Sequence, residues 1–321
     1  MMKKPLSIFG LILTGTIFLI MSCGGGGGGG GGVSSALTNS NATAVAGVTL
    51  SSMRLLVDTS YLGSASVERG SSQTQGFLQA ILRESLLSTK NISGRGIAAF
   101  EDKTEACSGG GTKRVVSEWS GDAASTRDVK SKVTYSSCRE GSETWDGILE
   151  INIQGLQSMP EAVSTVATLT YSDAIEGDIL TLTGAKVLYS NFIYKDNIAS
   201  GARVELTGRM SGMVKGKKLS AEYDSFRMSY ALAGPDVVLT LEGTINPDCI
   251  SRWISVSTVE TVRFDLGNRC PSSGKVALTE GNSTYVLSFE GFSGVKILYN
   301  GNQITSFAIC NDIEGICTDI K

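Results

Sequence analysis

The chain has 321 residues with a formal net charge of −3, and it contains no histidine. The charge leaves no basic excess that would hold a nucleic acid. The absence of histidine excludes Ser-His-Asp and Cys-His nucleophilic sites, histidine-ligated metals and a histidine general base. We therefore expect neither a nucleic-acid partner nor histidine-dependent catalysis.

The first 23 residues contain features in the order that is typical of a bacterial export signal. Lys3 and Lys4 supply positive charge, and residues 5–21 are apolar and uncharged. The strongly hydrophobic part is shorter than the ~20 residues that comfortably span a bilayer. It ends in the sequence Ile-Met-Ser-Cys23, which resembles the lipobox of bacterial lipoproteins. The match has an aliphatic residue, a small residue and the cysteine in their usual places, although Met21 departs from the small residue common at its position.

The resemblance implies cleavage before Cys23, a thioether-linked lipid on that cysteine and acylation of the new amino terminus. The alternative is a transmembrane helix followed by a chance cysteine, but glycines rather than charged residues come next. Gly24 stands where an aspartate would retain a lipoprotein in the inner membrane, so the sorting rule of enteric bacteria favours the outer membrane. Removing residues 1–22 leaves 321 − 22 = 299 residues and, without two lysines, a net charge of −3 − 2 = −5.

A flexible tether is expected over residues 23–43, beginning at the lipidated cysteine. It contains nine consecutive glycines, and a chain of this kind behaves as a coil that extends about 25 Å on average. Residues 44–96 are then interpreted as a helical segment. Residues 44–62 have mixed periodicity that slightly favours a helix, and residues 76–89 predict one clearly. In the second helix, five apolar residues recur at helical spacing, opposite a polar face of Gln79, Arg83 and Glu84.

From about residue 112 the pattern changes to strict alternation of apolar and polar residues. Val129, Val133 and Tyr135 alternate with lysines and threonine, and similar runs follow along the chain. This alternation predicts antiparallel strands with one buried face, so residues 97–321 are interpreted as a disulfide-containing β domain. Turn signals separate the strands, one of them at Ser211-Gly212, and a phase slip between Tyr223 and Phe226 predicts a bulge.

The fold class is therefore mainly β: a large antiparallel meander of roughly a dozen strands, with a short N-terminal helical segment. A sheet of this size must curl, close or fold over itself. The alternatives are a two-sheet sandwich, a barrel, or a curled half-barrel with the 76–89 helix on its concave side. The half-barrel resembles the lipoprotein-carrier proteins of the bacterial envelope in its order of elements. The arrangement is also similar to uncharacterised β-rich bacterial lipoproteins.

Six cysteines remain after Cys23 is assigned to lipid. An even number in an exported chain indicates disulfides, and six cysteines allow 15 pairings. We expect consecutive pairs, because each would join neighbouring strands or one loop: Cys107–Cys138, Cys249–Cys270 and Cys310–Cys317. Zinc binding would need closely spaced cysteine pairs, which the sequence lacks.

Two clusters of charged residues were considered as binding sites. The basic cluster is expected at a hairpin tip and consists of Arg209, Lys215, Lys217 and Lys218. It is either a solvated turn that prevents edge-to-edge pairing or a contact for anionic lipid headgroups or cell-wall polymer. The acidic C-terminal cluster comprises Asn311, Asp312, Glu314 and Asp319, and its spacing matches no calcium loop. No metal and no cofactor are predicted.

No catalytic residue is assigned. Ser272 and Lys275 have SxxK spacing, but they follow Cys270-Pro271 in an expected turn rather than beginning a helix. Two aromatic runs at alternate spacing are expected in the core or, in a half-barrel, along an apolar cavity for an acyl chain. They consist of Tyr189, Phe192 and Tyr194, and of Phe226, Met228 and Tyr230.

The sequence favours a lipid-anchored envelope protein that is not an enzyme and that serves in structure or protein binding. Its partners would be the membrane, through Cys23, and another envelope protein. The alternative is a carrier or sensor of a hydrophobic or acyl ligand held in the curled sheet. A third hypothesis is an enzyme that uses carboxylates alone, as some glycosidases do.

Overall fold

The computed structural model describes most of the chain from residue 37 onward, so the last part of the expected tether is described and belongs to a helix from Asn39. The described ranges are residues 37–57, 77–90, 98–120, 128–156, 159–175, 177–195, 198–214, 217–234, 236–250, 252–265, 270–291 and 294–308. All of them belong to one compact unit, Ala36–Lys321. Cys23, Lys215 and the acidic C-terminal cluster lie outside the described residues.

The described residues of this unit form two helices, α1 (Asn39–Val57) and α2 (Phe77–Lys90), which precede the strands. The strands are β1 (Ala98–Ala106), β2 (Thr112–Ser120), β3 (Asp128–Glu140), β4 (Glu143–Leu156), β5 (Met159–Asp173), β6 (Asp178–Lys195), β7 (Ile198–Val214), β8 (Lys217–Ala233), β9 (Asp236–Pro247), β10 (Ile254–Asp265), β11 (Cys270–Glu280), β12 (Ser283–Glu290), β13 (Val295–Tyr299) and β14 (Asn302–Phe307). The helix predicted over residues 76–89 is confirmed by α2, and α1 confirms the helical reading of most of residues 44–62.

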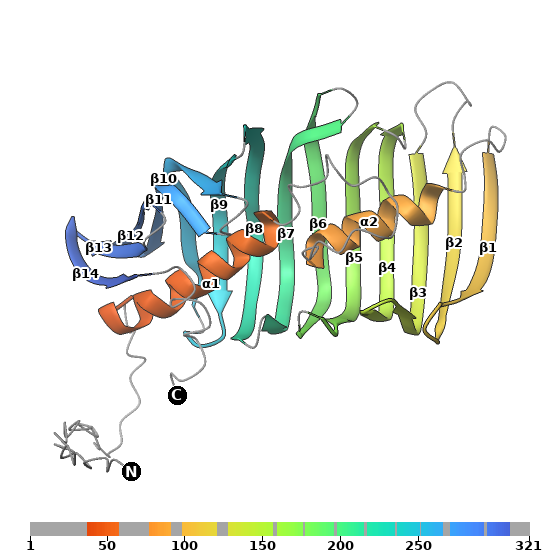
Figure 1. Cartoon of the computed structure of the whole chain (residues 1–321), viewed down its shortest axis with the longest axis horizontal. Helices are drawn as coiled ribbons and strands as arrows, with labels where there is room; N and C mark the ends of the chain where they lie inside the picture. The colour runs from red at the N-terminus through yellow and green to blue at the C-terminus, as the bar shows by residue number, and fades with distance from the viewer. Residues whose placement is uncertain are drawn as a thin grey trace, which may run out of the picture. The chain divides into compact units, whose positions relative to one another are not determined.

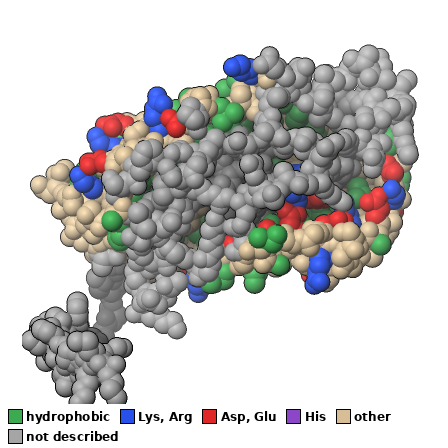
Figure 2. Space-filling view, in the orientation of Figure 1, with side chains coloured by type: hydrophobic (Ala, Val, Ile, Leu, Met, Phe, Trp, Pro, Cys, Tyr) green, Lys and Arg blue, Asp and Glu red, His purple; other side chains and the backbone are tan. Residues whose placement is uncertain are grey.

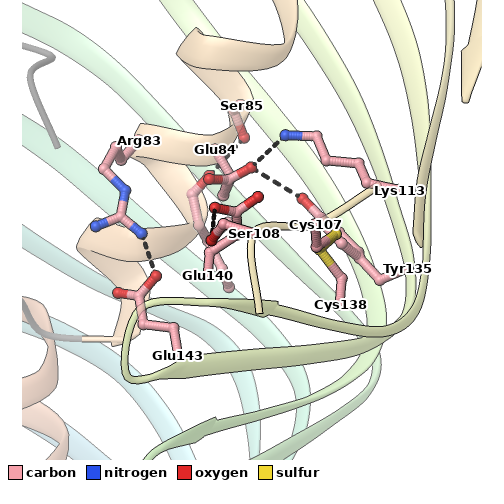
Figure 3. A network of polar contacts seen from close by, with 11 residues as sticks. Arg83, Glu84, Ser85, Cys107, Ser108, Lys113, Tyr135, Cys138, Glu140 and Glu143 are labelled. Carbon is pink, nitrogen blue, oxygen red and sulfur yellow. Dashed lines mark hydrogen bonds and ion pairs between the residues drawn. A yellow bond between two sulfur atoms is a disulfide. The ribbon is translucent and has the colours of Figure 1, made fainter. Parts of the chain in front are cut away.

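The strands form a single antiparallel sheet in sequence order from β1 to β14, so each strand pairs with its neighbours in the chain (Figure 1). β1 and β14 are the two edges, and the sheet is open. The mainly β meander is confirmed. One sheet with both helices against it corresponds to the curled alternative rather than to a two-sheet sandwich. The strands curve around α2 in Figure 3.

Alternation along the strands builds the core. In β6, Leu180 and Leu182 are completely buried, whereas Ile179 of the same strand faces outward and is exposed. Buried apolar residues from every strand between β2 and β13 form one cluster with those of both helices. The hydrophobic face of the sheet is thus the face that the helices cover.

The two helices cover different parts of that face. α1 packs against β8, β9 and β11, and α2 packs against β3 and β5. Within α1, the Ser52 hydroxyl bonds to the Tyr223 hydroxyl of β8 at 2.8 Å. Neither of these described helices has the length and hydropathy needed to cross a membrane.

The strand pairing is irregular where the alternation of apolar and polar residues changes phase. Ser225 has a positive φ of 49°, and the β8–β9 register shifts between Asp224 and Arg227, which confirms the bulge predicted between Tyr223 and Phe226. The turn predicted at Ser211-Gly212 is wrong, because β7 continues to Val214. Gly212 is needed inside the strand because a Cβ there would lie 1.9 Å from the carbonyl oxygen of Ile179.

Candidate functional site

The densest group of buried polar side chains lies between α2 and the first strands of the sheet (Figure 3). At its centre, the Lys113 ammonium of β2 donates to the Glu84 carboxylate of α2 at 2.8 Å. Glu84 is 4 % exposed and Lys113 is 8 % exposed. The expectation that Glu84 belongs to a solvent-facing side of the helix is therefore wrong. An available sequence signal was the phase of β2, because Lys113 shares it with the buried residue Trp119.

Tyr135 of β3 completes the central contact. Its hydroxyl donates to the Glu84 carboxylate at 3.3 Å, and its ring centroid lies 6.0 Å from the Lys113 nitrogen. Burial raises the pKa of Tyr135 well above its ordinary value, and the nearby Glu84 charge raises it further. The phenol therefore stays protonated and acts as a hydrogen-bond donor to Glu84.

A second ion pair involves Arg83, the residue that precedes Glu84 in α2. The Arg83 guanidinium donates to the Glu143 carboxylate at the start of β4, and both side chains are largely shielded from solvent. Burial acts to lower the pKa of Arg83, but the Glu143 charge and hydrogen bond raise it overall. Tyr171 of β5 lies 3.5 Å from the other Glu143 oxygen, and burial followed by the Glu143 charge raises its pKa. Two consecutive residues of α2 thus connect the helix to β2, β3 and β4, and Glu143 extends the network to β5.

A disulfide supports the sheet beside this network. Cys107, after β1, is bonded to Cys138 of β3 with a Cα–Cα distance of 5.4 Å, which confirms the first predicted pair. Cys249 is also disulfide-bonded. The side chains of Cys270, Cys310 and Cys317 lie outside the described part of the chain, so their pairing stays a prediction.

The side chains beside this disulfide include residues of metal-ligand type. The Glu140 carboxylate lies close to both sulfurs of Cys107 and Cys138, and these three residues are the group of metal-ligand type that the described residues contain. The sulfurs are joined to each other, so they are not the thiolates that a metal would need. Glu140 instead accepts a hydrogen bond from Ser108 at 3.0 Å. The arrangement fits a structural crosslink rather than a metal centre.

The network holds α2 on the sheet by electrostatic interactions. The Glu84 carboxylate accepts from both a cation and a phenol, and the Arg83 cation is paired, so these groups satisfy one another. A buried charge of this kind is costly unless it is paired and hydrogen-bonded. The network therefore fixes α2 on the sheet through two ion pairs rather than presenting a free acid and base.

The predicted basic cluster is divided by the structure. Arg209 lies inside β7 and forms an ion pair with Asp248, so the expected position at a hairpin tip is wrong for it. Lys217 begins β8, and Lys218 follows it with an exposed side chain. Arg209 and Lys218 both have exposed side chains, and Arg209 is paired with Asp248, whereas Lys218 lies beside the β7–β8 turn.

The aromatic runs lie mainly in the core. Tyr189, Phe226, Met228 and Tyr230 are each at most 3 % exposed, and Phe192 packs against the core cluster. The Tyr194 hydroxyl donates to the Pro160 carbonyl oxygen at 2.7 Å.

The SxxK spacing is not placed at a helix start. Ser272 and Lys275 both lie in β11. The Ser272 hydroxyl donates to the Arg263 carbonyl oxygen, and Lys275 pairs with Glu260. The two side chains thus have separate partners.

The outward face carries a groove over β2–β5 with a volume of about 370 Å³. Opposite charges lie across its strands: Lys130 is in register with Glu118, and Lys132 forms a 3.1 Å ion pair with Glu150. Val166 of β5 adds an apolar, 41 % exposed wall. This mostly charged and polar lining differs from the predominantly apolar lining of a small-molecule cavity.

Comparisons of the chain with protein-family models, with curated proteins and with solved structures found no match.

Proposed function

We propose that the chain is a lipid-anchored protein of the bacterial cell envelope that acts by binding another protein, without catalysis. Anchoring is supported by the export-signal features and by the lipobox-like sequence at Cys23. Binding through the outer face is supported by one structural observation above all. The concave face of the sheet is covered by α1 and α2, and α2 is attached there by the buried Glu84–Lys113 pair.

This arrangement leaves the outward face as the surface for contact. The groove over β2–β5 has a charge pattern that a partner of complementary pattern would recognise, with Val166 as an apolar contact. Such complementarity gives specificity and association rate more than raw affinity. The proposal is therefore a reversible protein contact on the outward face of β2–β5.

Photo-cross-linking in the cells that make the protein tests this proposal. A benzophenone amino acid at Val166 is expected to yield one discrete cross-linked species, which mass spectrometry would identify as a protein. The same amino acid at Val259, an exposed valine of β10 several strands away, is the matched control. Identical adduct patterns at both positions, or no adduct at Val166, would contradict the proposed contact surface.

A second function, a carrier or sensor of an acyl ligand, is favoured by a different observation. The hydroxyl of Tyr230 is buried on the covered face and has no hydrogen-bond partner within the described residues. Displacement of a helix would open an aromatic surface with a free hydroxyl beside it. Native mass spectrometry of residues 33–321, purified without detergent, separates the two functions. A stoichiometric acyl-chain adduct would replace the protein-binding proposal with the carrier, whereas a ligand-free mass supports protein binding.

A further inference from the structure

We infer that one end of the sheet, at its β5–β8 part, is a surface that rests on the lipid bilayer. This inference depends on the proposed anchoring at Cys23. In a meander, alternate turns lie at the same end, so the β1–β2, β5–β6, β7–β8 and β11–β12 turns share one end, which we call the proximal end. It is the lower end of the sheet in Figure 1.

The described chain begins at the proximal end. The Tyr285 hydroxyl donates to the Leu37 carbonyl oxygen at 3.0 Å, and Tyr285 is two residues beyond the first residue of β12. The β11–β12 turn directly precedes that strand. Leu37 is separated from Cys23 by 13 residues, nine of them glycines. A glycine-rich segment of this length spans about 20 Å on average, so a lipid on Cys23 would keep the proximal end near the membrane.

Exposed apolar side chains lie at this end beside a cation. Ile175, in the β5–β6 turn, is 78 % exposed, and Ile179 and Met213 are 51 % and 38 % exposed. Ile179 is directly in register with Met213, which is in register with Lys218. The three side chains therefore form one row across β6, β7 and β8 on the outward face. Exposed aliphatic side chains bind a membrane interface by burying apolar area, and a neighbouring lysine adds attraction to anionic lipids.

The charge around the row is mixed. Asp173 and Asp178 are paired in register at the β5–β6 turn beside the isoleucines, whereas Asp248 beyond β8 is offset by Arg209. Lys218 supplies positive charge on the β8 side of the row. Figure 2 shows the helix-covered side of the molecule, with acidic and basic side chains at both its left-hand and its right-hand parts, whereas the row lies on the outward face of the sheet. The proposed contact with the bilayer therefore consists of the apolar row together with Lys218.

Trp253 provides a natural reporter of this contact. It lies between β9 and β10 at the proximal end and is 45 % exposed, whereas Trp119 and Trp145 are buried in the core. The experiment uses the lipidated full-length mature protein on vesicles of phosphatidylethanolamine and phosphatidylglycerol that contain brominated acyl chains. The Trp253 signal is obtained by subtracting the spectrum of Trp253→Phe. We expect bromine to lower this signal about twofold or more, because interfacial contact brings the indole to the acyl boundary.

Two sets of variants locate the contact. Ile175→Ser/Ile179→Ser/Met213→Ser is expected to abolish most of the quenching. The matched control is Ile193→Ser/Leu232→Ser, which removes similarly exposed apolar side chains at the opposite end and should leave the quenching unchanged. Lys218→Glu should reduce quenching on anionic vesicles and have no effect on neutral ones. Circular dichroism confirms that each variant is folded.

The possible outcomes distinguish failure of the proposed membrane surface from failure of the proposed anchoring at Cys23. A mature mass without lipid on Cys23 would contradict the proposed anchoring itself. Lipidated protein whose Trp253 is not quenched, or whose quenching survives the triple substitution, would overturn the proximal surface alone. Equal losses in the proximal and control variants would also overturn it.

Discussion

The Glu84 carboxylate of α2 lies 2.8 Å from the Lys113 ammonium of β2, and both side chains are buried between the helix and the sheet. Removing one partner of such a pair leaves an uncompensated buried charge, which typically costs about 3–5 kcal/mol. We therefore predict that Lys113→Met lowers the free energy of unfolding by about 3 kcal/mol. Urea denaturation followed by circular dichroism measures this change.

The double variant Glu84→Leu/Lys113→Met distinguishes a coupled pair from two separate contacts. It removes both charges, so we expect its loss of stability to be smaller than the sum of the losses of the two single variants, by about 2 kcal/mol or more. Glu150→Gln is the control, because it breaks the exposed Lys132–Glu150 pair and should cost at most about 1 kcal/mol. Additive single costs would mean that the pair does not attach α2.

The disulfide between Cys107 and Cys138 closes a loop with a sequence separation of 31. Constraint of the unfolded chain by a loop of this length contributes about 3–4 kcal/mol of stability. We predict that Cys107→Ala/Cys138→Ala loses stability of that order, with the urea midpoint lowered. The substitution is preferable to a reducing agent, because Cys249 is also disulfide-bonded and would be reduced at the same time. A loss below about 1 kcal/mol would show that the bond does not constrain the unfolded state.

The strands were predictable where their two faces have different environments. β6 alternates because the helices cover one face and solvent meets the other, and this contrast produces the period-two pattern. The alternation begins at about residue 112, after β1, so the pattern does not predict this strand. It is an edge strand with side chains such as Phe100 exposed, so no hydrophobic alternation is required of it.

The polar network could not be predicted from local patterns, because its charges are compensated only in three dimensions. Glu84 alone fits the polar side of a helix, and Lys113 alone fits an exposed strand position. Their burial becomes favourable only when α2 packs over β2, 29 residues away in the chain. By contrast, the Cys107–Cys138 pair was predictable from the expectation that consecutive cysteines pair, although it joins the β1–β2 turn to β3 rather than two neighbouring strands.

Buried tyrosines predict a loss of stability at alkaline pH. Burial raises the pKa of Tyr223 to about 12, from an ordinary value of 10.0, although the hydrogen bond with Ser52 acts in the opposite direction. The unfolded state therefore loses this proton first, at about pH 10. Stability is full below that pH and falls as the pH rises toward about 12, by up to roughly 2–3 kcal/mol for this residue.

Urea denaturation at several pH values between neutral and strongly alkaline measures the effect. Tyr223→Phe lowers stability at neutral pH by about 1 kcal/mol through the lost Ser52 bond. It should also make the alkaline slope shallower by about one proton. An unchanged slope would mean that Tyr223 ionises as readily in the folded protein as in the unfolded chain.

Gly147 allows β4 and β5 to approach each other closely beside the polar network. Its φ is +122°, and a Cβ there would lie 2.4 Å from the Thr168 carbonyl oxygen of β5. Gly147 is in register with Tyr135, so displacement of β4 would disturb the donor to Glu84. We predict that Gly147→Ala lowers the free energy of unfolding by about 2–3 kcal/mol, through backbone strain and steric conflict.

Gly141, in the β3–β4 turn, is the matched control for this substitution. Its φ is +64° and no atom lies within 4 Å of the position a Cβ would take. Asparagine tolerates this left-handed conformation, so Gly141→Asn should change stability by less than about 1 kcal/mol. Urea denaturation of both variants gives the comparison. If Gly147→Ala were as mild as Gly141→Asn, the close approach of β4 and β5 would not be needed to hold Tyr135 against Glu84.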